Sequence, residues 1–289
     1  MNIDTSIQAM MESFEHQLRI SLAETPLDER LNEAVAYMLL SAGKRFRPRL
    51  ILGVNEDLGG RGDDSIYLAS AVECIHVASL IHDDLPALDN DDFRRGKPTC
   101  HKIFGEAVAV LAGDSLFGMA FDFLSKCDAR RGAKATQYLS RALMGLCAGQ
   151  SEDLLNLTSD KKLLSMFAKK TGCLIGASAA FGALSSGNSP DKEMDYYNWG
   201  VQLGIAFQVA DDFRDRFGTK DERGRPESSD QRNAKVGLFQ NKSAEAVAEA
   251  CREQIKQVIS SYCSLSGVSA ERSATLALIK QQFVHFVAE

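Results

Sequence analysis

The chain has 289 residues, of which 45% are hydrophobic and 25% are charged, and its net charge is −6 at pH 7. This composition predicts a substantial core in one large or two small domains, and the negative charge disfavours nucleic acid as a partner. The seven cysteines are widely spaced without a Cys-x-x-Cys pair, which predicts free thiols and a cytoplasmic protein. Neither a signal peptide nor a stretch of about 18 uncharged apolar residues is found, so no membrane span is expected.

Helical periodicity dominates the chain, and alternating strand patterns and Asn-Gly hairpin signals are missing. The long polar segment 218–234 is typical of a lid or binding loop. No composition shift or repeat divides the chain, so one all-α domain over residues 1–289 is predicted, built as a helical bundle. In chain order, helices are expected over residues 28–41, 65–82, 106–125, 133–157, 163–184, 193–217, 244–264 and 270–287.

The first of two aspartate clusters comprises Asp83, Asp84 and Asp89. Pro86 cannot continue a helix, so Asp83 and Asp84 are expected at a helix C-terminus and Asp89 must fold back toward them. Carboxylates in that place face the negative end of the helix dipole and repel one another, which a bound cation would relieve. The arrangement predicts a site for Mg²⁺, which takes carboxylate oxygens and substrate phosphates.

The second cluster comprises Asp211, Asp212 and Asp215. Gln208, Asp211 and Asp215 are spaced by three and four residues, which places them on one face of a helix. Either cluster by itself could be a solvated run of charges or a helix end. Two such clusters after apolar helices favour a shared metal–diphosphate site instead.

Basic residues accompany both clusters, and arginine and lysine are the side chains that recognise phosphate. A single surface cation is more often solvated, but the placement of these residues predicts two phosphate sites, one reached through metal and one directly. His76 is either a phosphate donor or a satisfied core histidine, and its spacing leaves both alternatives open. Motifs for acyl transfer and zinc are missing. The basic residues are Lys44, Arg45, Arg47, Arg94, Arg95, Lys169, Lys170, Arg225 and Lys235.

Together these motifs resemble the trans-isoprenyl diphosphate synthase (polyprenyl synthetase) family over essentially the whole chain, and the aspartate run resembles that of bacterial farnesyl and plant-type geranylgeranyl diphosphate synthases. The resemblance implies an all-α bundle with a central active-site cavity, a homodimer, and condensation of isopentenyl diphosphate with allylic diphosphates. The motifs that carry it are residues 43–48, 83–99, 149–150, 170–172 and 207–215.

The resemblance also implies roles for individual residues. About three Mg²⁺ ions on the allylic diphosphate would be held by Asp83, Asp84, Asp89, Asp211, Asp212 and Asp215. Arg94, Lys170, Arg225 and Lys235 would contact that diphosphate; Lys44, Arg47, His76 and Arg95 would bind isopentenyl diphosphate; Thr171 and Gln208 would line the carbocation. Arg94, Lys170, Thr171 and Gln208 are the expected catalytic residues.

Product length in this family depends on the residues four and five before the first aspartate, here Ser79 and Ala78. Because both are small, the tail pocket is expected to stay open, which favours geranylgeranyl over farnesyl diphosphate, with Phe117 and Phe121 as a lower floor. The chain departs from the family pattern at Arg225, where lysine is usual, and in lacking a basic C-terminal tail. The alternatives are a non-catalytic partner subunit of a prenyl synthase, or a terpene cyclase.

Overall fold

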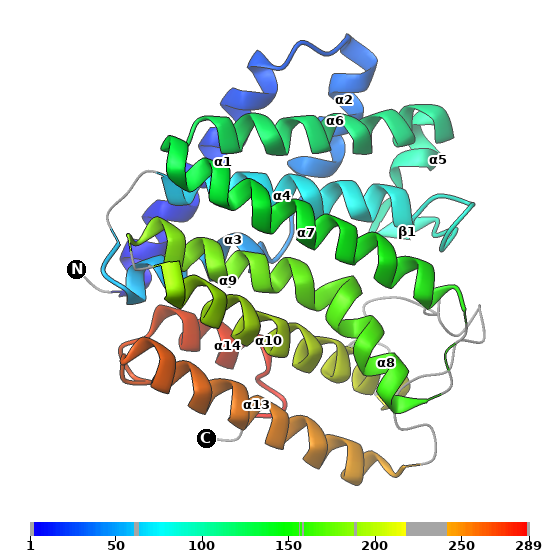
Figure 1. Ribbon diagram of the computed structural model, residues 1–289. Coiled ribbons are helices and arrows are strands. Elements are labelled where there is room, and N and C mark those ends of the chain that lie inside the picture. Colours follow the sequence, from blue (N-terminus) through cyan, green and yellow to red (C-terminus); the bar gives the residue numbers. More distant parts are fainter. Residues whose placement is uncertain are drawn as a thin grey trace.

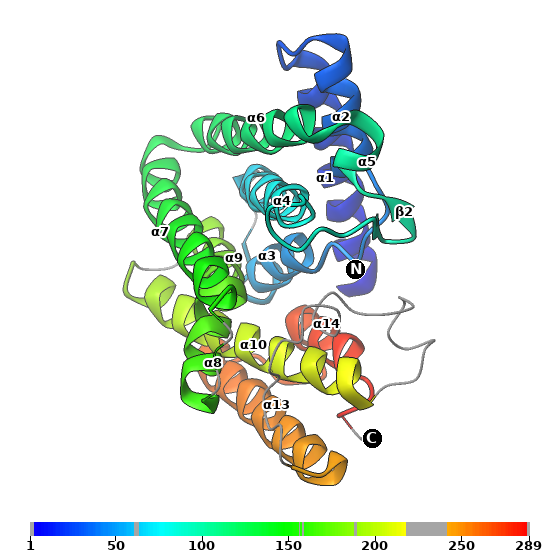
Figure 2. The same cartoon turned by 90° about the vertical axis from the view of Figure 1, so that its right-hand side faces the viewer.

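The computed structural model describes residues 3–60, 64–155, 157, 159–187, 190–217 and 242–287. Within these ranges the chain is a bundle of helices with one short β-hairpin (Figures 1 and 2). The predicted all-α class is confirmed. The elements are α1 (Ile3–Glu24), α2 (Glu29–Leu39), α3 (Phe46–Asp57), α4 (Asp64–Asp83), β1 (Phe93–Arg94), β2 (Lys97–Pro98), α5 (Cys100–Phe104), α6 (Glu106–Ser125), α7 (Ala129–Asp153), α8 (Asp160–Phe167), the π-helix η1 (Ala168–Gly172), α9 (Cys173–Ser185), α10 (Pro190–Phe217), α13 (Ala244–Ser266) and α14 (Ala274–Gln282).

Helix α4 lies at the centre of the bundle, and Figure 2 shows α3, α6, α7, α9 and α1 around it. Its buried residues run almost without interruption from Leu68 to Ile81, which fits its apolar sequence. By length and composition α4 and α6 could each cross a membrane; 67% of the α4 window is buried inside the bundle but only 44% of the α6 window. Core helices pass the same test, and α6 leaves Val110, Leu111 and Phe121 exposed.

Helices α4, α7 and α10 run in the same direction, so their C-terminal ends lie at one end of the molecule (Figure 1). Asp83 is the last residue of α4, Asp153 is the last of α7, and Asp211 and Asp215 stand in the last two turns of α10. The negative ends of three helix dipoles therefore meet where the acidic residues gather. This end of the bundle strongly favours a cation.

The predicted helix pattern needs correction in several places. The helix expected over residues 163–184 is divided into α8, η1 and α9. Helices α1 and α3 were not predicted. Pro48 of α3 is tolerated because first-turn N–H groups have no acceptor within the helix. The hairpin was missed because its turn is Arg95-Gly96, with φ of 54° and 75°, rather than Asn-Gly.

Asp57 joins the C-terminal helices to the rest of the bundle. Its carboxylate accepts hydrogen bonds from Ser273 Oγ (2.6 Å), Ala274 N (2.8 Å), Thr275 N (3.2 Å) and Tyr262 Oη (2.7 Å). A carboxylate at the start of α14 satisfies N–H groups that no helical carbonyl can reach and complements the helix dipole. This contact fixes α13 and α14 against the end of α3.

Candidate active site

The first aspartate cluster is a helix end followed by a loop that folds back, as predicted. Helix α4 ends at Asp83, and the following turn brings Asp89 N to 2.9 Å from the carbonyl oxygen of Asp83. Asp91 N donates in the same way to the carbonyl of Asp84 (3.2 Å). The loop therefore holds Asp89 beside Asp83 through backbone bonds, before any ligand binds.

Asp83 and Asp84 are held in surroundings that disfavour their charges. Burial raises the pKa of Asp83 to about 6, although the nearby positive charge of Lys170 acts in the opposite direction. Burial also raises the pKa of Asp84, which is fully enclosed, against the effect of Arg94. Asp84 Oδ2 is buried without a hydrogen-bond partner. Both carboxylates would gain from a divalent cation.

Arg94 is committed to this cluster rather than free for a ligand. Its Nε and Nη2 lie 2.6 and 2.5 Å from Asp84 Oδ1, and Nη2 lies 3.6 Å from Asp91 Oδ2. Asp91 is 3% exposed, and sequence reasoning missed its part in the site because it looked like one more acid in a polar run. Contact between Arg94 and a diphosphate would require this guanidinium to leave Asp84.

The second cluster lies on α10, where Asp211 accepts a hydrogen bond from Arg214 Nη2 (2.8 Å). Asp212 follows Asp211 by one residue and so lies about 100° around the helix from it. Its charge, after burial, helps to raise the pKa of the Cys251 thiol on α13 to about 11. Of the three predicted metal ligands on α10, Asp211 and Asp215 share the face of Gln208, as their spacing predicted, whereas Asp212 lies off that face.

The π-helix η1, which lies between α8 and α9 in the chain, is hydrogen-bonded through its side chains to α7 on one side and to α10 on the other. Lys170 Nζ donates to Asp153 Oδ2 (2.7 Å), and Thr171 Oγ1 donates to Gln208 Oε1 (2.8 Å). A Cβ on Gly204 would come within 2.6 Å of the Cα of Gly172, so glycine is required for this close crossing. Thr171 and Gln208, predicted to act together, are in direct contact, and π-helical segments of this kind are frequent at functional sites. Sequence analysis did not predict a place for Asp153 in the site, because it has no second acidic residue on the same helix face.

Among the residues that the structure describes, no three His, Cys, Asp or Glu side chains lie close enough to hold a metal ion by themselves. Mg²⁺ is usually bound through one or two carboxylates together with substrate phosphates and water. The raised pKa of Asp83 and the unpartnered Asp84 Oδ2 fit such an ion. The donor set suits a metal that arrives with, or is completed by, a diphosphate.

A cationic cluster lies nearer the middle of α4. Burial first, and then the charges of Arg47, Arg95, Arg94 and Arg45, lower the pKa of His76, so its ring is neutral at neutral pH. Arg47 Nε is buried without a partner, and burial lowers the pKa of this arginine to about 10. An arginine that makes no direct ion pair with a carboxylate is a basis for phosphate recognition.

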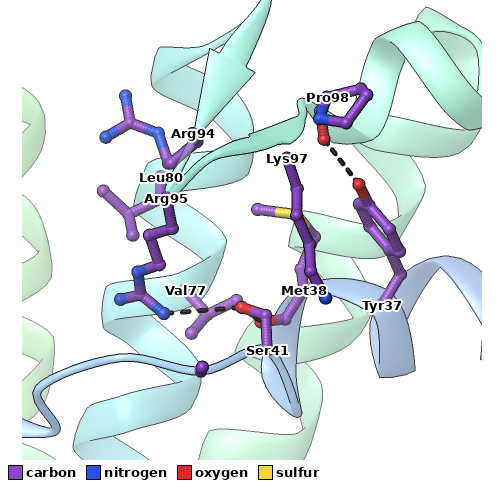
Figure 3. Close-up of a pocket in the computed structure, with 10 residues that line it drawn as sticks. Tyr37, Met38, Ser41, Val77, Leu80, Arg94, Arg95, Lys97 and Pro98 are labelled. Carbon is purple, nitrogen blue, oxygen red and sulfur yellow. Dashed lines mark hydrogen bonds between the residues drawn. The ribbon is translucent and has the colours of Figure 1, made fainter. Parts of the chain in front are cut away.

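Arg95 reaches this cluster from the hairpin turn. Its guanidinium extends toward Ser41, with a 3.5 Å contact from Nη1 to Oγ, in front of Val77 and Leu80 of α4 (Figure 3). A cavity of about 40 Å³ lies beside it, also lined by Met38 and Lys97. Lys44 is exposed at the same loop. The structure therefore brings together Arg47, His76 and Arg95, with Lys44 at the rim.

The sequence matches the family described as Polyprenyl synthetase over residues 28–269. The chain belongs to this family. Geranylgeranyl pyrophosphate synthase 4 of Arabidopsis thaliana is 38% identical over 257 residues, covering 79% of this chain and 69% of that protein. The farnesyl diphosphate synthase of Geobacillus stearothermophilus is 39% identical over 220 residues, covering 72% and 73%. The chain is thus a prenyltransferase of the short-chain prenyl diphosphate synthase type.

Comparison with solved structures supports the same family and fold. A geranyltranstransferase from Thermotoga maritima superposes with a TM-score of 0.81 at 32% identity and covers 97% of this chain and 98% of its own. A geranyltransferase from Helicobacter pylori, solved with magnesium and isoprenyl diphosphate, has a TM-score of 0.79 at 27% identity and covers 97% and 94%. The expected isoprenoid-synthase fold is confirmed.

The residues predicted to set product length in this polyprenyl synthetase lie on α4. Ala78 is fully buried and Ser79 is 9% exposed, with its hydroxyl donating to the carbonyl of His76 (2.8 Å). Phe117 is half-buried and stacks edge-on to His82 at 5.7 Å. Phe121 is 40% exposed, so this chain alone does not enclose it as a pocket floor. Arg225 and Lys235 lie outside the described residues.

Proposed function

We propose that this prenyltransferase condenses isopentenyl diphosphate with dimethylallyl, geranyl or farnesyl diphosphate, giving geranylgeranyl or farnesyl diphosphate. The observation that carries the proposal is the pair of opposite poles on α4. Asp83 and Asp84 at its C-terminus suit a metal-bound allylic diphosphate. His76, about two turns earlier on α4, gathers with Arg47 of α3 and Arg95 of the hairpin turn, and this cationic cluster suits a second diphosphate without metal.

The reaction begins when the bond between the allylic carbon and the diphosphate oxygen breaks and leaves an allylic cation. Mg²⁺, about three ions per site, supplies positive charge to the leaving diphosphate when bound. Asp83, Asp84, Asp89, Asp211 and Asp215 are proposed to hold these ions, with Asp212 acting from farther away. Lys170 adds a cation beside Asp83, and Arg94 adds another once it leaves Asp84. Arg225 and Lys235 are proposed as further contacts to the same diphosphate.

Thr171 and Gln208 are proposed to line the cation with side-chain oxygens. Gln208 Oε1 already accepts the Thr171 hydroxyl hydrogen, so the lone pairs of Thr171 Oγ1 remain for the positive carbon. The terminal alkene of isopentenyl diphosphate, anchored by Lys44, Arg47, His76 and Arg95, attacks that carbon and forms the new C–C bond. The departing diphosphate then takes the proton, so no protein base is required. Water must be kept out, since it would trap the cation.

Geranylgeranyl diphosphate is the proposed main product. Ala78 and Ser79 present one methyl and one hydroxymethyl group where a larger side chain would end the tail pocket early. Relatives named for both the geranylgeranyl and the farnesyl product are about equally similar to this chain, so the support comes from the small side chains.

A homodimer is proposed as the working form, with the apolar face of α6 as its contact. Val110, Leu111 and Phe121 of α6 are 40%, 52% and 40% exposed, and Met144 of α7 is 64% exposed. Burying these side chains against a second copy of the chain would stabilise the dimer by about 25 cal/mol for each Å² of apolar surface removed from water. The cytoplasm is the compartment in which we expect it.

Product sizing tests the proposal. Purified protein is incubated with Mg²⁺, isopentenyl diphosphate and each allylic primer in turn, and the products are dephosphorylated and separated by chain length. Linear alcohols of fifteen or twenty carbons are expected, and EDTA should abolish them. Cyclic hydrocarbons from the primer alone would favour a terpene cyclase. If products form only after an active synthase is added, the protein is better explained as a non-catalytic partner subunit.

A further inference from the structure

Arg45 belongs to the same basic segment as Lys44 and Arg47, but its surroundings are different. Its side chain is 5% exposed and donates to Glu15 Oε1 (2.8 Å), Glu73 Oε1 (2.7 Å) and the carbonyl of Leu39 (2.8 Å). Its backbone has φ of 47°, a conformation that is costly for a residue with a side chain. Arg45 is therefore fully engaged by the protein and fixes the turn that starts α3.

Glu73 is the buried partner in this arrangement. It is 1% exposed, and its second oxygen, Oε2, has no hydrogen-bond partner. It stands three residues before His76 on α4, so both side chains lie along one stripe of the helix. Its negative charge also favours the charged forms of Arg47 and Arg95. The charge of this one carboxylate thus acts on three arginines, and within the described part of the chain Arg45 is the one that it hydrogen-bonds.

The two arginines of the cationic cluster depend on the turn that Arg45 fixes. Arg47 follows it by two residues in the first turn of α3. The guanidinium of Arg95 packs over Gly43, where even a Cβ would come within 2.6 Å of Nη1, and Arg95 itself has φ of 54°. A shift of residues 43–47 would therefore move both phosphate-binding side chains.

We propose that Glu73 and Arg45 form a buried positioning pair that sets Arg47 and Arg95 for the diphosphate of the isopentenyl substrate, without touching it. This rests on the proposed function, and it divides the basic segment: Lys44 and Arg47 face the ligand, whereas Arg45 faces the protein.

The direction of the effect separates positioning from simple electrostatics. If Glu73 were only a background charge, removing it would reduce repulsion and tighten the binding of a diphosphate. If it positions the arginines, removing it weakens that binding although the site becomes more positive.

Arg45→Lys is the decisive variant, because it keeps every charge and loses the fork that joins Glu15, Glu73 and Leu39. We expect its KM for isopentenyl diphosphate to rise about tenfold, while its KM for the allylic substrate stays within about twofold. Glu73→Gln should change in the same direction. Asp64→Asn is the matched control: Asp64 is 8% exposed, pairs with Arg131 and begins α4, about 18 Å along the helix from His76. It should lower Tm and leave both KM values unchanged.

Three results would overturn the proposed positioning role. The first is a KM for isopentenyl diphosphate that falls in Glu73→Gln. The others are seen in Arg45→Lys: both KM values unchanged, or the KM values for the two substrates raised by the same factor. If Glu73→Gln does not fold, Arg45→Lys decides. If the wild-type protein shows no catalytic activity, the proposed function has failed. The positioning role is then tested by calorimetry of inorganic diphosphate binding in EDTA. Binding about tenfold weaker in Arg45→Lys supports the positioning pair, and equal binding refutes it.

Discussion

The buried charge of Asp83 predicts that, without a bound cation, ionisation of this carboxylate lowers the free energy of unfolding. The pKa of Asp83 is raised by burial from 3.8 to about 6. Between these values the folded protein binds more protons than the unfolded chain, so stability falls as pH rises from about 4 to 6 and the full cost is present above that. The shift of about 2 pH units corresponds to ~3 kcal/mol, an upper figure because the side chain is partly exposed.

Asp83→Asn removes this cost while keeping the shape of the side chain. In EDTA at pH 8 the variant should unfold at a higher temperature than the wild type, by up to about 6 °C for ~3 kcal/mol in a chain of this size. Most of the advantage should be gone near pH 4, where Asp83 is protonated in the folded protein and partly protonated in the unfolded chain. Calorimetry from pH 4 to 8 measures both curves.

Adding Mg²⁺ with inorganic diphosphate supplies the second half of the test. The wild type should gain stability from the bound ion, by about 2.7 kcal/mol when the ligand is at a hundred times its Kd, and Asp83→Asn should gain much less. Parallel curves for the two proteins at every pH, with equal gains from the ligand, would refute the argument that Asp83 is a strained metal ligand.

Three further variants probe other parts of the structure. Ala78→Tyr should shorten the main product toward fifteen carbons, as measured by product sizing; an unchanged distribution would remove Ala78 from the pocket floor. Gly204→Ala places a methyl group against Gly172, so it should cost about 1–3 kcal/mol of stability and lower kcat by separating Thr171 from Gln208. A wild-type Tm and kcat would contradict the close crossing. Asp57→Ala removes the acceptor of four hydrogen bonds and should lower the free energy of unfolding by about 3–5 kcal/mol with KM unchanged, as read from urea denaturation. A loss under about 1 kcal/mol would show that Asp57 does not join α3 to α14.

The sequence was most informative where local chemistry decides the structure. Helix α6 begins and ends where its pattern predicted, and Pro86 marked the end of α4 because no neighbour can restore a missing N–H group. The spacing of Gln208, Asp211 and Asp215 predicted one helix face, because 3.6 residues per turn is a property of the backbone alone.

Features that depend on packing between distant segments could not be predicted in this way. The π-helix at residues 168–172 accompanies the close approach of α10 at Gly204, and neither segment shows this by itself. The three cations Lys44, Arg45 and Arg47 look alike in the sequence. Only the buried Glu73, 28 residues after Arg45, distinguishes the arginine that holds the fold from the one left for the ligand.

The spacing along α4 explains how one helix could take part in two proposed diphosphate sites, one with metal and one without. His76 and Asp83 are seven residues apart, which at about 1.5 Å per residue separates the cationic cluster from the acidic end by about 10 Å. Ala78 and Ser79 lie on α4 between these two clusters, where the proposed function places the carbon chains. The acidic end coincides with three helix C-termini, whose dipoles and carboxylates would repel a bare diphosphate, and this is why metal is proposed there. The cationic cluster near the middle of α4 is proposed to bind its diphosphate without metal, because the charge that would oppose it, Glu73, is already held by Arg45.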